Sequence, residues 1–353
     1  MMKICVFVHG ADAFYSKAIF DILGKIAEYG DFEVFITGTM ARTASLDVDF
    51  NVKVWNGTPS ELLKALEREF DLFLLLSYSK SPESGYAFGE IVFKRSKIRK
   101  PFLQLELCNK TAVAWNCEAK IAEDLGFRMA EAIGFDNVWR ENEKTYRRIL
   151  AVEPGEFLLV GGIVVGKVRD NEVLLVAENG EIVELRGVEI KEHGLEKLRR
   201  IYQGIDLEKI KICSLKGFKT KEAEFKGKRG SGVAFIDHSG DMVYRFAGNC
   251  EGAVCIGDDT TAIASEILFR FGTPVLGIVD GDRDFISQIK NIHSDSEIFV
   301  TKHDDLAGKI IFEEVFCEKE ILEENFTSLK DRIAKILQSK DLLLSRKAMK
   351  DFI

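Results

Sequence analysis

The chain has 353 residues, 46% of them hydrophobic, which is enough for two domains with separate cores. Its 57 acidic and 49 basic residues give a formal net charge of -8, which excludes a global basic field for nucleic acid or an anionic membrane surface. No stretch approaches the ~18 uncharged apolar residues that span a bilayer, and seven cysteines without a C-x-x-C pair predict reduced thiols in a cytoplasmic protein.

Short apolar runs alternate with helical patterns over residues 1–150. Such near-continuous runs predict strands buried on both faces, and the stretches between them carry apolar residues at helical spacing. The expected strands are 3–10, 32–38, 52–55, 71–79 and 101–107, and the expected helices are 16–30, 60–70 and 117–135. This rhythm predicts a Rossmann-like or flavodoxin-like α/β domain with a doubly wound parallel sheet.

Residues 151–200 have a different pattern, with strand-like runs at 156–168 and 171–187. The second run contains Asn179-Gly180 between two alternating segments, which is a strong hairpin signal. We therefore expect a small antiparallel β module, followed by helical character at 193–202 and 206–213.

A second α/β domain is predicted over residues 201–317. A hairpin is expected to turn at His238, between strands 232–237 and 241–246. Further strands are expected at 252–259, 274–282 and 296–301, with helices at 260–272, 283–291 and 304–316. The tail, 318–353, has the pattern of one or two amphipathic helices that pack on either domain or on another subunit, so a homo-oligomer stays open.

A lysine-rich segment lies between the β module and the second α/β domain. Residues 216–229 contain six Lys or Arg, but Glu222 and Glu224 interrupt the charge. The segment has two interpretations, a solvated loop or a strip that binds phosphate or RNA.

Acidic residues follow two successive strands of the second α/β domain. Asp258 and Asp280 come after strands separated by one helix, so a right-handed crossover predicts that both lie at one edge of the sheet. Converging carboxylates repel unless a cation neutralises them, and Mg²⁺ prefers such oxygen ligands. We expect Asp258, Asp280 and Asp282 to bind Mg²⁺ and Asp258, Asp259 and Asp280 to be catalytic. The alternative is that these acids only cap the helices that follow.

Hydroxyl and basic side chains near the strand ends are candidates for phosphate binding. Thr260 and Thr261 begin the helix after the first acidic cluster. In the first domain, Gly38, Thr39 and Arg42 follow one strand and Lys80 follows another, so a small anionic or nucleotide-like ligand is expected at that edge.

The segments GAVCIGDD and GIVDGDRD resemble the acidic strand ends of Toprim-type and other Mg²⁺-dependent Rossmann-like phosphoryl-transfer domains. Asp280 and Asp282 match the Asp-x-Asp that holds metal in those domains. Such domains also place a glutamate after an earlier strand, with more chain before the Asp-x-Asp than the 22 positions from Asp258 to Asp280, and Glu251 is the available substitute.

The whole chain also resembles an uncharacterised family of archaeal proteins. The resemblance is carried by HG near the start, ITGTMARTA, SGYAFGE, HGLEKL and the pair GDDTT and GIVDGDRD. This resemblance implies no established activity. Separately, the Lys- and Glu-rich charge content with five prolines is typical of a thermophile.

The residues thus predict a cytoplasmic Mg²⁺-dependent enzyme that transfers or hydrolyses a phosphoryl group on a phosphorylated or nucleotide-like substrate. Two alternatives stay open: a protein that senses a small anion or serves in an assembly without catalysis, and a protein that binds RNA through residues 216–229.

Overall fold

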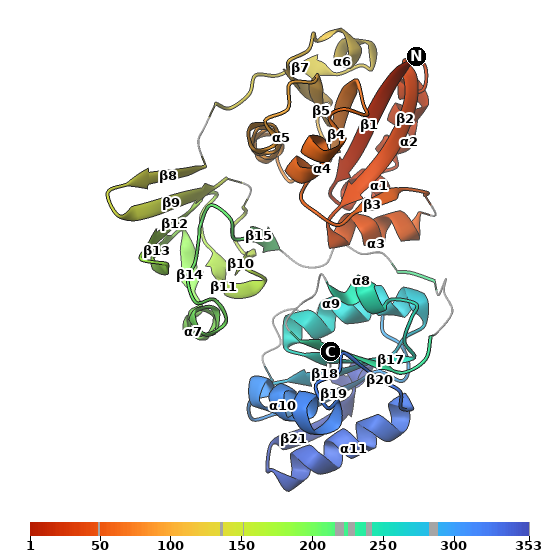
Figure 1. Ribbon diagram of the computed structural model, residues 1–353, viewed down its shortest axis with the longest axis vertical. Helices are drawn as coiled ribbons and strands as arrows, with labels where there is room; N and C mark the ends of the chain where they lie inside the picture. Colours follow the sequence, from red (N-terminus) through yellow and green to blue (C-terminus); the bar gives the residue numbers. More distant parts are fainter. Residues whose placement is uncertain are drawn as a thin grey trace. The chain divides into compact units, whose positions relative to one another are not determined.

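Two compact units make up the computed structural model, Met1–Lys219 and Thr220–Ile353 (Figure 1). Each unit has its own sheets, helices and apolar core. The structure describes residues 1–48, 50–134, 137–150, 152–215, 222–224, 230–237, 242–281 and 289–352. The predicted fold class is confirmed: each unit contains a mainly parallel sheet, and unit 1 also contains a small antiparallel β module.

The N-terminal sheet of unit 1, sheet A, has the strand order β3-β2-β1-β4-β5-β6-β7. Its strands are β1 Met2–His9, β2 Gly30–Thr37, β3 Lys53–Trp55, β4 Leu72–Ser77, β5 Phe102–Glu106, β6 Thr111–Trp115 and β7 Arg128–Met129. Strands β1 to β5 pair in parallel, and β6 runs antiparallel to β5. The strand order reverses between β1 and β4, which is the point where doubly wound sheets bind ligands.

Helices cover both faces of sheet A because its strands are apolar on both faces. Helices α1 Asp12–Tyr15, α2 Ala18–Ile26 and α3 Thr39–Asp47 contribute buried residues to the core on one face. Helices α4 Pro59–Leu66 and α5 Pro82–Ser96 contribute to the core on the other. Both α4 and α5 start with a capping box, formed by Thr58 and Ser81 with the third helical residue, and with a proline in the first turn.

The helix predicted over 117–135 is wrong. Among the described residues of this range only Lys120–Asp124 form a helix, α6, and the chain then enters β7. Gly126 has a φ of 88°, a conformation that ends a helix, and the buried side chains of Leu125 and Phe127 hold the turn in the core.

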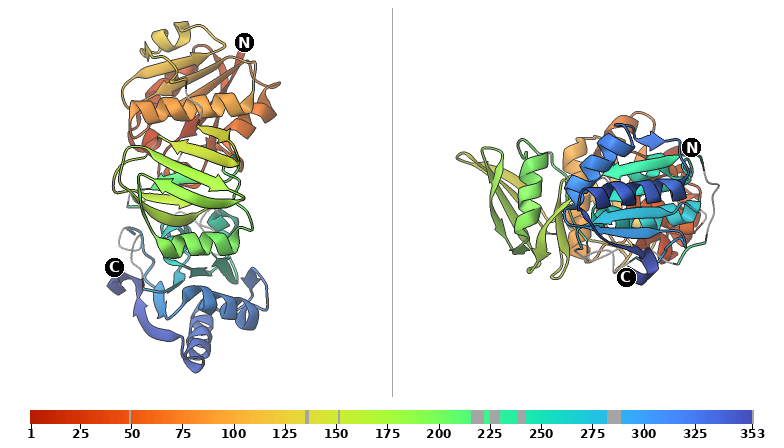
Figure 2. Two further views of the ribbon diagram at one scale, coloured as in Figure 1. Left: turned by 90° about the vertical axis from the view of Figure 1, so that its left-hand side faces the viewer. Right: turned by 90° about the horizontal axis from the view of Figure 1, so that it is seen from below.

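The β module of unit 1 consists of two antiparallel sheets and one helix (Figure 2). One sheet has the order β13-β12-β9-β8 and the other β14-β11-β10-β15. The strands are β8 Val138–Glu141, β9 Lys144–Ile149, β10 Phe157–Val160, β11 Ile163–Val168, β12 Val173–Glu178, β13 Glu181–Arg186, β14 Val188–Ile190 and β15 Ile212–Leu215, and the helix is α7 Glu192–Ile201.

The hairpin predicted at Asn179-Gly180 is confirmed, because β12 and β13 pair across it. Both turn residues have positive φ, 51° and 81°, as a two-residue primed turn requires. The helical character expected at 206–213 is wrong, because this stretch is a turn followed by β15.

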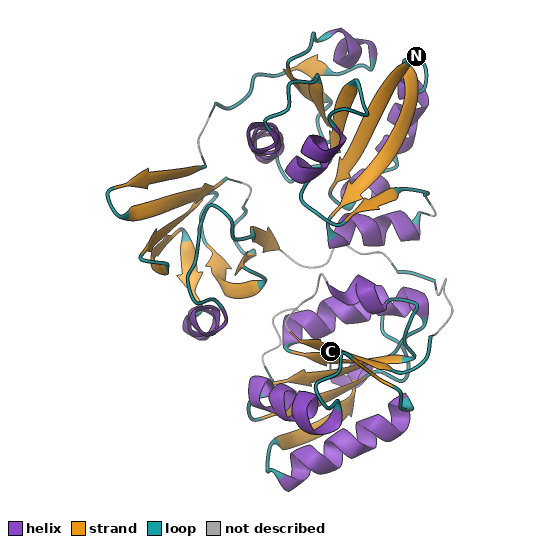
Figure 3. Cartoon of the chain, in the orientation of Figure 1, coloured by secondary structure: helices purple, strands orange, loops and turns teal. Residues whose placement is uncertain are grey.

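Unit 2 contains a six-stranded sheet, sheet D, with the order β20-β16-β17-β18-β19-β21. Its strands are β16 Val233–Asp237, β17 Gly252–Ile256, β18 Val275–Val279, β19 Glu297–Thr301, β20 Ile321–Leu322 and β21 Leu343–Ala348. The four central strands pair in parallel, and β20 and β21 pair antiparallel at the edges. The helices are α8 Val243–Phe246, α9 Asp258–Leu268, α10 Asp304–Ile310, α11 Phe326–Ser339 and α12 Met349–Phe352 (Figure 3).

The hairpin predicted around His238 is wrong. Residues 243–246 form α8, and β16 pairs in parallel with β17 instead. Val243 and Phe246 are both buried, and their spacing of three is helical. His238 and most of the helix predicted at 283–291 lie outside the described residues.

The C-terminal tail belongs to unit 2. Helix α11 is the predicted amphipathic helix, and with α10 it packs on one face of sheet D. Strand β21, which the sequence pattern did not indicate, extends the sheet beside β19. None of the helices in the described part of the chain has the length and apolar character that crossing a membrane requires.

Candidate functional site

Asp258 and Asp280 occupy equivalent positions at the carboxyl edge of sheet D. Strands β17 and β18 are parallel neighbours, with Ile256 opposite Ile278. Asp258 lies two residues beyond Ile256, and Asp280 lies two residues beyond Ile278. The two strand ends thus share one edge of the sheet, as the crossover rule predicts.

The residues around these aspartates differ in exposure. Asp258 and Asp259 are the first two residues of α9 and are partly buried, whereas Asp280 is exposed. Thr260 and Thr261 are buried. Asp282 lies outside the described residues.

Thr261 faces strand β18. A Cβ on Gly277 would lie 2.5 Å from Cγ2 and 2.9 Å from Oγ1 of Thr261, so the absence of a side chain at Gly277 lets α9 pack closely on the sheet. The Thr261 hydroxyl is buried and has no hydrogen-bond partner among the described residues. This position puts Thr261 in the packing between helix and sheet.

Both units contain the same junction between a strand and a helix. Gly38 precedes α3 with φ 84° and ψ 149°, and Gly257 precedes α9 with φ 89° and ψ 152°. The glycine at each helix start provides no side-chain cap. Thr39 and Arg42 lie in the first turn of α3, and the Arg42 amide bonds Gly38 O at 3.2 Å.

Within the described residues no group of three or more His, Cys, Asp and Glu side chains is arranged to hold a metal ion. Mg²⁺ is commonly held by one or two protein carboxylates, with waters and substrate oxygens filling the other positions. Asp258 and Asp280 lie at equivalent strand ends, and Mg²⁺ binding by them stays a prediction.

A row of polar residues crosses the carboxyl edge of sheet A. His9 pairs in register with Ser77 on β4, and Ser77 pairs with Glu106 on β5. Ser77 and Glu106 are fully buried, whereas His9 is partly buried. The His9 ring stacks on Phe88 of α5, with ring centroids 3.8 Å apart. Burial, with a further contribution from the Lys80 charge, lowers the pKa of His9 to about 4, so the imidazole is neutral at pH 7.

Glu106 organises the loop after β4. Its carboxylate accepts hydrogen bonds from Ser77 Oγ at 2.8 Å and from the Ser79 amide at 2.9 Å. Buried carboxylates need such donors because they have lost their hydration. Gln104 donates to Ser77 Oγ at 3.1 Å and to Gly85 O at 2.7 Å, which ties the same loop to α5.

Gln104 and Glu106 were missed as site residues in the sequence. They interrupt the apolar run 101–107 at alternate positions, so they lie on one face of β5. Gly85 and Gly89 lie one turn apart on α5, above this face, and a Cβ on either glycine would lie within about 2.1 Å of an oxygen of these side chains. The available signal was two polar residues two positions apart in an expected strand, together with two glycines four positions apart in the preceding helix.

Lys80, predicted to bind phosphate, is held by the β module. Its ammonium lies 2.6 Å from Glu156 Oε1 and 3.1 Å from Ser214 Oγ. The Glu156 side chain is 1% exposed and the Lys80 side chain 28% exposed. Glu156 also accepts hydrogen bonds from Ser214 Oγ and the Glu153 amide.

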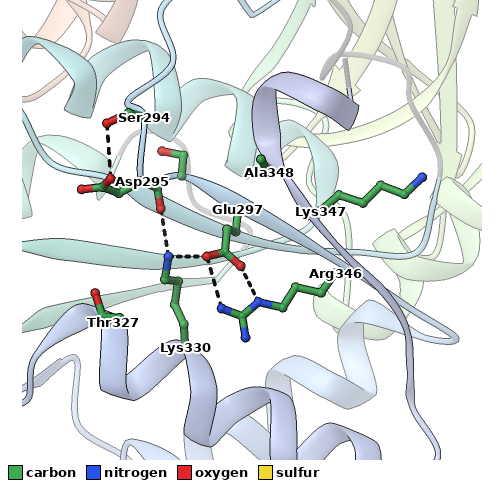
Figure 4. A pocket seen from close by; sticks show the side chains of 9 residues that line it. Ser294, Asp295, Glu297, Thr327, Lys330, Arg346, Lys347 and Ala348 are labelled. Atoms are coloured by element: carbon green, nitrogen blue, oxygen red, sulfur yellow. Dashed lines mark hydrogen bonds and ion pairs between the residues drawn. The ribbon is translucent and has the colours of Figure 1, made fainter.

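A pocket of about 600 Å³ lies at the opposite, amino-terminal end of β19 (Figure 4). Lys330 and Arg346 both point at Glu297, with Lys330 Nζ 2.5 Å and Arg346 Nε 2.6 Å from its carboxylate oxygens. Arg346 also pairs with Asp331 at 2.7 Å. These ion pairs fasten α11 and β21 to β19, and we assign them a structural role.

The basic segment predicted to bind RNA or phosphate lies mostly outside the described residues. Of residues 216–229 the structure describes 222–224 alone. RNA binding by this segment stays a prediction.

Comparison with known proteins identifies the family of the chain. The family model described as an uncharacterized protein conserved in archaea (DUF2117) matches residues 6–319, and the chain belongs to this family. The chain is 34% identical over 354 residues to the uncharacterized protein MJ0065 of Methanocaldococcus jannaschii, with 92% of this chain and 95% of the relative covered. No solved structure matches. The predicted resemblance to an uncharacterised archaeal family is confirmed, and the resemblance to Toprim-type domains stays a prediction.

Proposed function

We propose that this protein is a Mg²⁺-dependent enzyme that transfers or hydrolyses a phosphoryl group of a phosphorylated or nucleotide-like substrate. The observation that carries the proposal is the equivalent placement of Asp258 and Asp280, two residues beyond the paired Ile256 and Ile278 of neighbouring parallel strands. Ligands of open α/β sheets bind beyond the carboxyl ends of the strands.

Each residue of this edge has a proposed role. Asp258 and Asp280 provide the carboxylates that hold Mg²⁺, and Asp259 assists at the start of α9. Thr260, in the first turn of α9, takes up a phosphate oxygen at the positive end of the helix. When bound, Mg²⁺ neutralises charge on the phosphoryl group, and the chain positions that group for attack.

Calorimetric titration with Mg²⁺ tests the metal site. The wild-type chain should bind Mg²⁺, and Asp258→Asn and Asp280→Asn should each lower the affinity at least about tenfold because each removes a charged ligand. Asp305→Asn is the matched control, because Asp305 also lies in the first turn of a helix at a strand end of the same unit. Circular dichroism checks that all three variants fold.

The same variants test catalysis. Release of inorganic phosphate from nucleoside triphosphates and from pyrophosphate should require Mg²⁺ and fall in Asp258→Asn and Asp280→Asn but not in Asp305→Asn. Equal Mg²⁺ affinity in the wild type and in both variants would remove the metal site and the enzyme proposal with it.

A second candidate function is sensing of a small anion at the carboxyl edge of sheet A, without catalysis. It is favoured by Gly38, which opens α3 without a side-chain cap and whose Cβ direction has no atom within 4 Å. Inorganic phosphate should then raise the melting temperature without Mg²⁺, and Arg42→Ala should abolish the shift. A shift that requires Mg²⁺ would argue against this candidate.

A further inference from the structure

Lys80 is a cation shared between two parts of unit 1. It lies in the loop that follows β4, at the carboxyl edge of sheet A, and its ammonium reaches Glu156 and Ser214 of the β module. The Lys80 side chain keeps 28% of its surface exposed. An ammonium has three donors, and here they are divided between the Glu156 carboxylate and Ser214.

Glu156 does not depend on Lys80 alone. The carboxylate also accepts hydrogen bonds from the Ser214 hydroxyl at 2.7 Å and from the Glu153 amide at 2.9 Å. Three groups, Lys80 among them, therefore stabilise its charge. A carboxylate that keeps two other donors can release a lysine at lower cost than one that has the lysine as sole partner. A second anion can therefore compete for Lys80.

His9 supplies a neutral hydrogen-bonding group at the same strand edge as Lys80. Its ring is fixed by stacking on Phe88, and within the described part of the chain neither ring nitrogen has a hydrogen-bond partner. Lys80 lies three residues beyond Ser77, which pairs in register with His9 on the neighbouring strand. A neutral imidazole can donate one hydrogen bond to an anionic oxygen, and the ammonium supplies the charge.

The backbone between these two side chains is held in place. Glu106 accepts a hydrogen bond from the amide of Ser79, the residue before Lys80. The Tyr78 amide donates a hydrogen bond to His9 O at 3.5 Å. Gly10 follows β1 with a φ of 90°, and a Cβ there would lie 3.3 Å from Tyr78 O. The ends of β1 and β4 are thus fixed where the strand order of sheet A reverses.

We propose that Lys80 and His9 bind the carboxylate or phosphate group of a small metabolite, and that Glu156 competes with this group for Lys80 and so sets its affinity. The inference rests on the second candidate function, because it names side chains that bind the anion, and it is independent of the metal site in unit 2. It also gives the β module a regulatory part, since binding of the anion replaces the contact between Lys80 and the module.

The competing explanation is that Lys80 and Glu156 form a structural ion pair. In that case neutralising Glu156 changes stability but gives no gain in anion affinity. The proposal predicts a gain, because the anion no longer has to displace a charged partner.

Nuclear magnetic resonance of the histidine side chains separates these explanations. The ring signals are followed while inorganic phosphate is added, and acetate is titrated in parallel to decide whether a phosphate or a carboxylate is preferred. His9→Gln assigns the His9 signal, and the signals of His193 and His303 serve as internal references. Phosphate should shift the His9 signal saturably and leave the reference signals unchanged.

Three variants complete the test. Glu156→Gln should lower the half-saturating phosphate concentration about tenfold, because Gln keeps the acceptor but loses the charge. Glu208→Gln, which removes another paired glutamate of unit 1, should change nothing. The double variant Lys80→Met with Glu156→Gln leaves no buried unpaired charge, so it should fold, and it should show no saturable shift.

Two results would overturn the proposed competition between Glu156 and the anion for Lys80. One is equal phosphate affinity in Glu156→Gln and Glu208→Gln, and the other is a normal titration in the double variant; both leave anion binding itself intact. If neither anion shifts the His9 signal or the melting temperature in any variant, the second candidate function fails together with the proposed competition at Lys80.

Discussion

The Ser77 hydroxyl donates a 2.8 Å hydrogen bond to Glu106 on the neighbouring strand, and both side chains are fully buried. This bond lies directly beneath Gly85 of α5, where a Cβ would come 2.1 Å from Glu106 Oε2. Glu106 therefore requires a glycine at position 85. Because Gly85 has no side chain, α5 can pack closely over the buried carboxylate.

Gly85→Ala is expected to destabilise unit 1 by about 1–3 kcal/mol, because the new methyl group overlaps a carboxylate that cannot move without losing its hydrogen bonds. Gly24→Ala is the matched control. Gly24 also lies in a helix, α2, but a Cβ there meets no atom within 4 Å, so alanine should stabilise by roughly 0.5–1 kcal/mol through helix propensity. Urea unfolding followed by circular dichroism measures both, and equal effects of the two substitutions would contradict this account.

The apolar strands of sheet A could be predicted because burial on both faces makes them near-continuous apolar runs, as in Leu72–Ser77. The Asn179-Gly180 turn could also be predicted, because positive φ at both positions selects these residue types. Such features depend on local chemistry that the sequence displays directly.

Other features depend on long-range contacts that a local pattern does not carry. Lys80 pairs with Glu156, 76 positions later in the chain, and nothing near Lys80 in the sequence indicates this ion pair. Strand β21 pairs with β19 although its exposed residues resemble a surface segment. The candidate aspartates of sheet D were found from the sequence because each follows its own strand, which is a local signal.

His9 predicts a loss of stability in acid. Burial, then the Lys80 charge, lowers its pKa to about 4 from the ordinary histidine value of 6.5. Between these values the unfolded chain binds a proton that the folded chain does not, so the free energy of unfolding falls as the pH drops from 6.5 toward 4. The loss reaches roughly 3 kcal/mol.

Chemical denaturation at pH 7.0, 5.5 and 4.5 measures how the free energy of unfolding depends on pH. In His9→Gln the fall in this free energy between pH 7.0 and 4.5 should be smaller, because His9 no longer contributes to it. His193→Gln serves as the control for removal of a histidine elsewhere in unit 1. The assignment to His9 is disproved by identical pH dependence in the wild type and His9→Gln.

Gly180 is expected to be intolerant of side chains. Its φ of 81° is costly for other residues, and a Cβ would lie 3.1 Å from Gly204 Cα. Gly180→Ala should therefore destabilise the β module by about 1–2 kcal/mol. Asn179→Gly, one residue earlier with a φ of 51°, should have a much smaller effect because glycine accepts this conformation. Hydrogen exchange of the amides in β12 and β13 locates the change.

The pocket at β19 gives a prediction about charge. The Lys330 side chain is 6% exposed, and it donates to Glu297 and to Asp295 O. Burial alone would raise the pKa of Glu297, but hydrogen bonds from Arg346 and Lys330 outweigh it and hold the pKa below its usual range. The stabilisation from Glu297 is thus present above the unfolded pKa of ~4.3 and is lost as the pH falls further through the folded value.

Glu297→Gln should destabilise unit 2 by about 3 kcal/mol at pH 7, because it leaves the ammonium of Lys330 buried without a countercharge. Asp341→Asn is the control, since Asp341 pairs with Lys302 while its side chain is 93% exposed, and no measurable effect is expected. The difference between Glu297→Gln and the wild type should shrink as the pH falls through the lowered pKa of folded Glu297, because the carboxyl is then protonated in both states. A constant difference across that range would show that lost packing, and not lost charge, causes the destabilisation.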